Sequence, residues 1–181
     1  MKRILLFAII AMASVGAISA QKGKSALGLN VGFAPSISGY TANNMGVGIK
    51  YQYFITDVIR AEADIDYWFM AKEEDNFHSS AEQALFDVSV NFHYLFHASK
   101  NFNIYPLVGA GYALDMYKHE IEETEETCKH KHPEFLINAG IGAEYSFSER
   151  FSLGLEVKYQ YVTTTSQWSR LPISLGIAYK F

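Results

Sequence analysis

Residues 173–181, ISLGIAYKF, carry the pattern from which the fold can be predicted. Ile173, Leu175, Ile177, Tyr179 and Phe181 occupy every second position, and the residues between them are small or polar. Successive side chains of a β-strand point to opposite faces, so this alternation predicts a strand with one apolar and one polar face. The stretch also has about the length that a tilted strand needs to cross a bilayer.

The same alternation recurs along the rest of the chain, over residues 27–33, 47–53, 61–69, 86–94, 108–114, 135–145 and 153–161. After the N-terminal segment, no stretch approaches the roughly 18 consecutive apolar residues of a transmembrane helix. With 181 residues in total, the chain has room for one domain. The pattern therefore predicts an all-β protein of eight strands.

The connections between these strands alternate in length. Polar connections of seven residues or more cover 35–44, 71–83, 118–134 and 163–169, whereas short turns lie around Thr56-Asp57, 97–101 and 148–150. Long loops at one end and tight turns at the other are typical of outer-membrane barrels. The prediction is an eight-stranded antiparallel up-and-down transmembrane β-barrel, in which both ends of the barrel chain lie on the periplasmic, short-turn side.

A secreted lipocalin-like carrier is the alternative, and the distribution of charge argues against it. Such a carrier has an apolar cavity and a polar exterior. Here the apolar phase of the strands contains no charged residue. The other phase holds most of the strand charges and ten of the 13 glycines: Gly28, Gly32, Gly46, Gly48, Gly109, Gly111, Gly140, Gly142, Gly154 and Gly176. Since eight strands leave an interior that side chains just fill, the apolar phase is expected outside, against lipid.

Aromatic residues of the apolar phase gather near the strand ends, as interfacial girdles do. With strands running alternately up and down, one group falls at the periplasmic end: Tyr51, Tyr53, Phe92, Tyr94, Tyr145, Tyr179 and Phe181. The other falls at the outer end: Phe33, Tyr67, Phe69, Phe86, Tyr112, Phe135, Tyr159 and Tyr161.

The N-terminus has the features of a cleaved signal peptide over residues 1–20, which leaves a barrel domain over 21–181. Lys2 and Arg3 precede an apolar run, and small residues lead to Ala20. The net charge of -4 becomes more negative when the two cations are removed, which argues against a nucleic-acid partner. The lone Cys128 cannot form an internal disulfide.

With these features in hand, the mature chain resembles the small outer-membrane barrels of the OmpA/OmpX type and the opacity-like porin family. The alternation that ends in Tyr179 and Phe181 resembles the C-terminal signal by which such barrels are recognised for assembly, which implies the barrel-assembly machinery as a partner. Residues 105–112, YPLVGAGY, resemble the fifth strand of these barrels. Unlike in OmpA, we expect no periplasmic peptidoglycan-binding domain after the barrel. The resemblance implies location in the cell outer membrane, among lipid and lipopolysaccharide.

Charges of the inward phase are expected to form a structural network that fills the lumen, because buried charges need partners. A hairpin turning near Thr56 would place Lys50 opposite Glu62 and Gln52 opposite Arg60. An ion path or catalytic carboxylates are the functional alternatives. The inward charges are Lys50, Arg60, Glu62, Asp64, Asp66, Asp87, Asp115, Glu144, Glu156, Lys158, Arg170 and Lys180.

Two groups of residues carry hypotheses about chemistry. His93, in the inward phase, and His78-Ser79-Ser80, in a loop, form no ordered triad by sequence, so we expect no enzyme and no cofactor. His119, Cys128, His130 and His132 have the donor types that zinc or copper ions prefer, although their spacing matches no standard site. A solvated charged loop is the plainer interpretation of this segment, and its acids would also attract cations that bridge to lipopolysaccharide.

The predicted function is that of a monomeric surface protein with a packed polar lumen. Its long loops would make the contacts, in adhesion, host interaction or envelope integrity. The alternatives are a narrow porin-like channel for ions or small solutes, and a membrane-embedded enzyme that modifies lipid.

Overall fold

The computed structural model describes residues 21–38, 43–74, 80–119, 128–163 and 168–181. Within them, eight long strands form the fold: β1 (Ser25–Ala34), β3 (Asn44–Phe54), β4 (Ile59–Glu74), β5 (Ser80–Tyr94), β7 (Phe102–His119), β8 (Cys128–Ser146), β9 (Phe151–Thr163) and β11 (Ile173–Lys180). Three short strands continue or flank them: β2 (Ser36–Ser38), β6 (Phe96–Ser99) and β10 (Trp168–Arg170). The signal peptide predicted over 1–20 lies outside the described residues.

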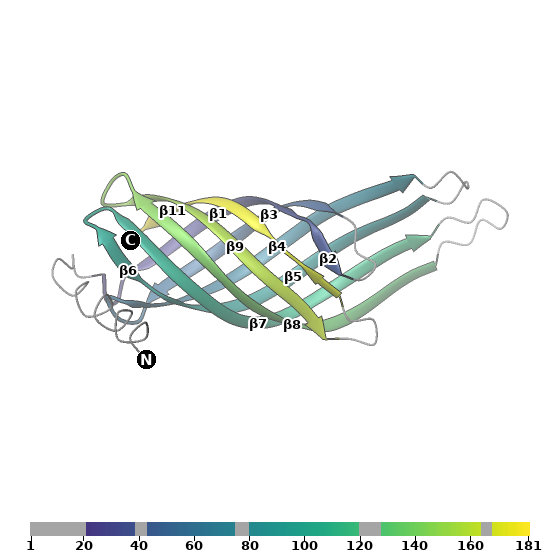
Figure 1. The fold of residues 1–181 in the computed structure, drawn as a ribbon, viewed down its shortest axis with the longest axis horizontal. Helices are drawn as coiled ribbons and strands as arrows, with labels where there is room; N and C mark the ends of the chain where they lie inside the picture. Colours follow the sequence, from purple (N-terminus) through teal and green to yellow (C-terminus); the bar gives the residue numbers. More distant parts are fainter. Residues whose placement is uncertain (1–20, 39–42, 75–79, 120–127, 164–167) are drawn as a thin grey trace, which may run out of the picture.

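The long strands close into one antiparallel barrel (Figure 1). Each pairs with its neighbour in the chain, and β11 pairs with both β9 and β1. The closing register runs from Ala26↔Lys180 to Phe33↔Ile173. The predicted eight-stranded up-and-down barrel is therefore confirmed. The described residues contain no helix long and apolar enough to span a membrane.

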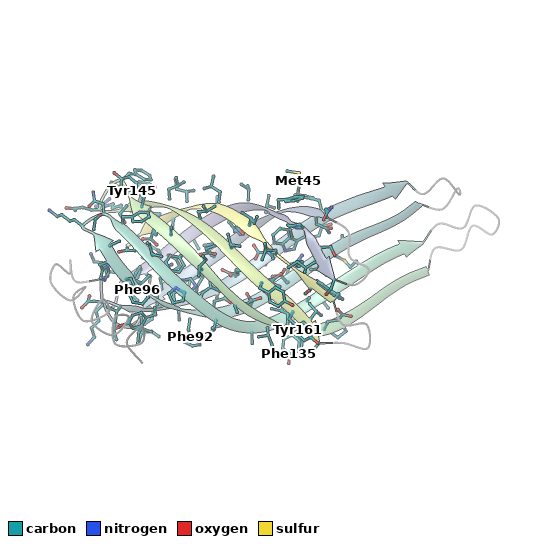
Figure 2. The ribbon with its side chains drawn as sticks, viewed as in Figure 1. Met45, Phe92, Phe96, Phe135, Tyr145 and Tyr161 are labelled. Atoms are coloured by element: carbon teal, nitrogen blue, oxygen red, sulfur yellow. The ribbon has the colours of Figure 1, made fainter. Side chains whose placement is uncertain are left out.

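The two faces of the barrel wall differ sharply in polarity. In β3 and β11 buried and exposed residues alternate, as the period of two requires. The exposed residues are apolar: Leu29 is 61% exposed and Ile141 64%. Figure 2 shows Phe96 and Tyr145 on the outside near the short-turn end, and Phe135 and Tyr161 near the opposite end. Polar and charged side chains occupy the interior.

Two features of the strands differ from the sequence prediction. The sequence predicts loops over 71–83 and 118–134, but much of each segment continues the strands, to Glu74 and from Ser80, and to His119 and from Cys128. Apolar alternation stops in these segments, although backbone pairing does not depend on it. The alternation therefore marks where the outer face ceases to be apolar rather than where a strand ends.

The predicted register of the first tight hairpin is wrong by two residues. Lys50 lies opposite Asp64 and Gln52 opposite Glu62, whereas Arg60 lies opposite Phe54. The cause is the turn, which is centred after Asp57 because the Thr56 amide donates to the Ile59 carbonyl at 3.1 Å. The Thr56 hydroxyl also accepts the amide of Ile59 at 2.9 Å and fixes this turn.

Candidate functional site

Lys50 lies at the centre of the lumen and joins strands that are not neighbours. Its ammonium donates to Glu156 at 2.8 Å, across the interior, and lies 3.5 Å from Glu62 on the adjacent strand. Gln52 donates to the other oxygen of Glu62 at 2.6 Å, and Tyr105 donates to Glu156 at 2.8 Å. The two carboxylates thus share one cation, and each also accepts a hydrogen bond from a neutral group inside the barrel, as buried charges require.

Arg60 organises the layer toward the short-turn end. It is fully buried and donates to Glu144 at 2.5 Å and to Nδ1 of His93 at 2.8 Å. Lys180 donates to the second oxygen of Glu144 at 2.6 Å. The guanidinium also lies 4.8 Å from the centroid of the Tyr105 ring, which itself stacks on His93. This cluster links residues of several strands and stabilises the barrel against opening.

Lys158 organises the layer toward the long-loop end. Its ammonium lies 2.9 Å from Asp64 and 3.9 Å from Asp66. Asn91 donates to Asp64 and Asn30 to Asp66, each at 2.8 Å. The two aspartates, which stand two residues apart on β4, therefore share one cation and two amides.

Arg170 closes the long-loop end of the lumen together with two tryptophans. It donates to Asp87 and to Gln160, each at 2.6 Å. Its guanidinium carbon lies 4.5 Å from the Trp68 ring and 5.8 Å from the Trp168 ring. Such cation–π contacts are strongest where water is excluded. Around them lies a buried apolar cluster, here called the outer seal: Ala34, Trp68, Leu85, Ala113, Leu136, Val162 and Trp168.

A second apolar cluster, here called the inner seal, blocks the short-turn end. It consists of Phe54, Leu95, Tyr105 and Leu107, all nearly inaccessible. Between the seals lies a cavity of about 20 Å³ lined in part by Lys50, Gln52 and Glu144, enough for about one water molecule. Apolar clusters at both ends and ion pairs between them fill much of the lumen that the described residues form. Alternation alone does not predict these seals, although Trp68, Leu107 and Leu136 stand out in the sequence as large apolar residues in the polar phase.

Glu62, His93 and Glu156 form the one group of lumen residues with ligand atoms close enough for a metal, within 4.8 Å of one another among the described side chains. Protein groups already bind its two carboxylates, however, whereas Nε2 of His93 is buried without a hydrogen-bond partner. Because Arg60 donates to Nδ1 of His93, a neutral ring carries its proton on Nε2, which lies 3.6 Å from Glu62. Lys50 neutralises Glu156. Hydrogen bonds already engage the two carboxylates that a metal ion would need, and among the described residues no serine or threonine hydroxyl is bonded to His93.

The longest hairpins extend past the rest of the barrel (Figure 1, right). Pairing of β3 with β4 ends at Gly46↔Trp68, and that of β9 with β8 ends at Thr163↔Phe135. The four central strands stay paired much further, to Glu74↔Ser80, Ala81↔His119 and His119↔Cys128. We call this extension the projecting sheet: 69–74, 80–85, 115–119 and 128–134.

The family model for the outer membrane protein beta-barrel domain matches residues 5–181 of the chain. The chain belongs to this family. This outer-membrane barrel is accordingly located in the outer membrane, and its apolar exterior is the surface that meets lipid. No curated protein sequence matches the chain closely enough to count as a relative.

Solved structures of other outer-membrane barrels share the fold. The attachment invasion locus protein Ail of Yersinia pestis has a TM-score of 0.61 at 14% identity, covering 88% of this chain and 99% of Ail. Neisserial surface protein A has a TM-score of 0.63 at 17% identity, covering 90% and 99%. A major outer membrane protein of Thermus thermophilus has a TM-score of 0.67 at 13% identity, covering 88% and 99%. At these identities the likeness concerns the fold alone.

In this outer-membrane barrel the residues singled out by sequence fall into three places. The lumen contains the predicted charges of the inward phase, with the exception of Asp115, whose backbone lies in the projecting sheet opposite His132. Tyr179 and Phe181 lie outside, 38% and 64% exposed. His119, Cys128, His130 and His132 lie in the projecting sheet, where β7 and β8 pair. His78 and Ser79 lie outside the described residues.

Proposed function

We propose that this barrel is a monomeric surface protein that acts through its projecting sheet, in adhesion, host interaction or envelope integrity. The observation that carries the proposal is the contrast between a sealed lumen and four strands that continue beyond the barrel wall. Outer-membrane barrels have short periplasmic turns and long extracellular loops, which puts the projecting sheet outside the cell.

The position of the outer aromatic girdle supports an aqueous location for the sheet. Tyr112 and Phe135 are paired across β7 and β8, contact each other edge to face at 5.7 Å, and face outward. The pair Asp115↔His132 lies three residues further along, or about 10 Å at the rise of a strand. The projecting sheet therefore begins where the lipid interface ends, among lipopolysaccharide head groups. There it is accessible to external partners.

The edges of the projecting sheet favour contact by side chains over strand addition. Edge strands that carry lysine and proline resist pairing with another strand. The edge strand β8 has the sequence CKHKHPE over residues 128–134, and the edge strand β4 has AKEE over 71–74. A partner is therefore expected to dock on a face of the sheet or on its tips.

The names of two structural neighbours are consistent with surface contact. Ail is the attachment invasion locus protein, and it has also been solved in complex with the heparin analogue sucrose octasulfate. Neisserial surface protein A is named for its location. These names support the class of function proposed here and do not give a ligand for this chain. Lipid, lipopolysaccharide and the assembly machinery remain the partners of the barrel wall.

The sealed lumen argues against the porin-like alternative, and conductance tests this directly. We expect the purified barrel to give no stable channels in planar bilayers, because paired charges and two apolar seals occupy the lumen. Reproducible unitary currents would contradict the sealed-lumen argument and favour a pore.

A hairpin replacement tests the role of the projecting sheet. Residues 116–133 are replaced by a two-residue turn, which shortens β7 and β8 to the level of the girdle, and the barrel is displayed on cells or in nanodiscs. We expect adhesion to an extracellular-matrix preparation to be lost while heat-modifiable migration, a measure of barrel folding, persists. A second variant replaces 71–83 in the β4–β5 hairpin and tests the other half of the projecting sheet. Unchanged adhesion in both replacements would contradict the proposal. Mass spectrometry of lipid A from a deletion strain tests the enzyme alternative.

A further inference from the structure

Gln21, the first described residue, is held against the tight turn between β3 and β4. Its backbone nitrogen donates to Oδ1 of Asp57 at 2.7 Å, and the backbone nitrogen of Lys22 donates to the same oxygen at 3.1 Å. Gln21 and Asp57 are both half-buried. A carboxylate from a distant part of the chain therefore fixes the point at which the chain enters the barrel.

The chain between Gln21 and β1 forms a tight turn that keeps this contact in place. The amide of Lys24 donates to the carbonyl of Gln21 at 3.0 Å, and Gly23 has a φ of 80°. A type II turn needs such a positive φ at its third residue, where glycine has no steric cost. The amide of Gly23 also donates to the carbonyl of Phe54 at 2.8 Å, which ties the turn to the end of β3.

Asp57 is itself connected to the neighbouring turn of the short-turn end. Its carbonyl lies 3.1 Å from Nε2 of His97 in β6, and Nδ1 of the same ring lies 2.7 Å from Oδ1 of Asn103 in β7. Because these contacts restrain the backbone of Asp57, its carboxylate is positioned in advance for the nitrogen of Gln21.

Removal of the predicted signal peptide changes the chemistry of this contact. Hydrolysis of the peptide bond between Ala20 and Gln21 adds the hydroxyl of water to the Ala20 carbonyl and a proton to the Gln21 nitrogen. The new α-amine is protonated at neutral pH, so a neutral amide with one donor becomes an ammonium with three. We propose that the amino terminus released after Ala20 binds Asp57 as an ion pair, and that this ion pair protects Gln21 from cyclisation.

An amino-terminal glutamine can modify itself. The α-amine attacks Cδ of its own side chain, a lactam forms and ammonia leaves, which yields pyroglutamate. Only a neutral amine has the lone pair that this attack needs. A carboxylate at hydrogen-bond distance favours the charged form of an amine, so Asp57 slows the reaction. The nearest cations in the sequence, Lys22 and Lys24, are exposed, so solvent screens their repulsion of the ammonium.

The side chain of Gln21 is less restrained than its backbone. Its Oε1 atom is buried without a hydrogen-bond partner among the described residues. The α-nitrogen is therefore the atom through which the protein controls cyclisation. The inference rests on the predicted cleavage after Ala20 and is independent of the proposed surface function.

Mass spectrometry of the protein purified from outer-membrane fractions tests the amino terminus. We expect a chain that begins at Gln21 and has a free amine. The folded barrel is then incubated at neutral pH in detergent micelles, and cyclisation is followed in the amino-terminal peptide as loss of the mass of one ammonia. In the Asp57→Asn variant we expect cyclisation to be about two- to fivefold faster, which is the effect of losing a partly exposed ion pair.

Glu149→Gln is the matched control, because it removes an acid from the turn between β8 and β9 at the same end of the barrel. This variant should cyclise at the wild-type rate, and heat-modifiable migration verifies that both variants fold. A different first residue, complete cyclisation in the wild type, or equal rates in the two variants would each overturn the proposal. Cell adhesion plays no part in this test, so its failure is distinct from failure of the proposed surface function.

Discussion

At the scale of single residues, glycines set how closely lumen side chains approach the wall. A Cβ on Gly142 would lie 2.5 Å from Cζ of Tyr105 and 2.7 Å from its hydroxyl. Tyr105 cannot move aside easily, because it is bonded to Glu156, stacked on His93 and part of the inner seal. Gly154 lines the same region, but the nearest atom to its Cβ position is 3.8 Å away.

These two glycines form a matched pair for mutation. We expect Gly142→Ala to lower the free energy of unfolding by about 1–3 kcal/mol, as overpacking does, and Gly154→Ala to leave it nearly unchanged. Urea titration of the barrel in lipid vesicles measures both. Equal losses of unfolding free energy in the two variants would show that these positions need glycine for the backbone conformation of the strand. They would not then need it for the space it leaves around Tyr105.

At the scale of strands, the alternation in the sequence predicted which residues face outward, and it did so for a physical reason. Lipid on one side and a packed interior on the other give each face of a strand its own composition. Leu29 and Ile141 are among the most exposed residues of the wall, and Arg60 and Glu62 are among the most buried. The same rule gave no information on 118–134, where both faces of the hairpin are polar.

The lipid face makes a direct prediction. Val90 lies mid-strand, paired with Ala63 and Ala110, and is 48% exposed. Val90→Arg should lower the free energy of unfolding in bilayers by about 2–4 kcal/mol, because the guanidinium is placed in hydrocarbon. Val90→Leu, which keeps the surface apolar, is the control and should be neutral. Unchanged stability of the arginine variant would place Val90 away from lipid.

Tyr179 and Phe181 allow two roles of the girdle aromatics to be distinguished, namely the signal for assembly and the contact with the lipid interface. Phe181 stacks on Tyr179 at 6.3 Å, while Phe147 stacks on Phe151 at 6.0 Å at the same end of the barrel. If Tyr179 and Phe181 act as the assembly signal, Phe181→Ala should reduce the amount of protein in outer-membrane fractions far more than Phe147→Ala. Similar amounts of the two variants would mean that Phe181 serves only as an interfacial residue.

At the scale of the whole molecule, the lumen is closed twice. The outer seal and the inner seal lie at opposite ends, and the ion pairs of Lys50, Arg60 and Lys158 fill the space between them. These pairs could not be predicted from sequence. Lys50–Glu156 and Arg60–Glu144 cross the interior between strands that are not neighbours, and the stagger of the closed barrel determines which residues meet.

Two seals in series predict that the loss of either one is not sufficient to open the lumen. Trp68→Ala removes one of the two tryptophans of the outer seal, and Leu107→Ala weakens the inner seal. We expect each single variant to remain without stable conductance in planar bilayers, because the second seal and the charge network persist. If the Trp68→Ala variant forms stable channels by itself, the outer seal is the single barrier to conductance.

The pairing of β1 with β11 also has a consequence for how the molecule forms. Ala26 and Lys180 come from opposite ends of the described chain. The hydrogen bonds between β1 and β11 therefore join residues that are separated by nearly the whole length of that chain. Contacts between residues so distant in sequence form slowly. Until they form, β1 and β11 each present an unsatisfied edge, which hydrocarbon cannot solvate. Nascent barrels therefore compete for each other's edges, and the yield of monomer should fall as the concentration of unfolded chain rises.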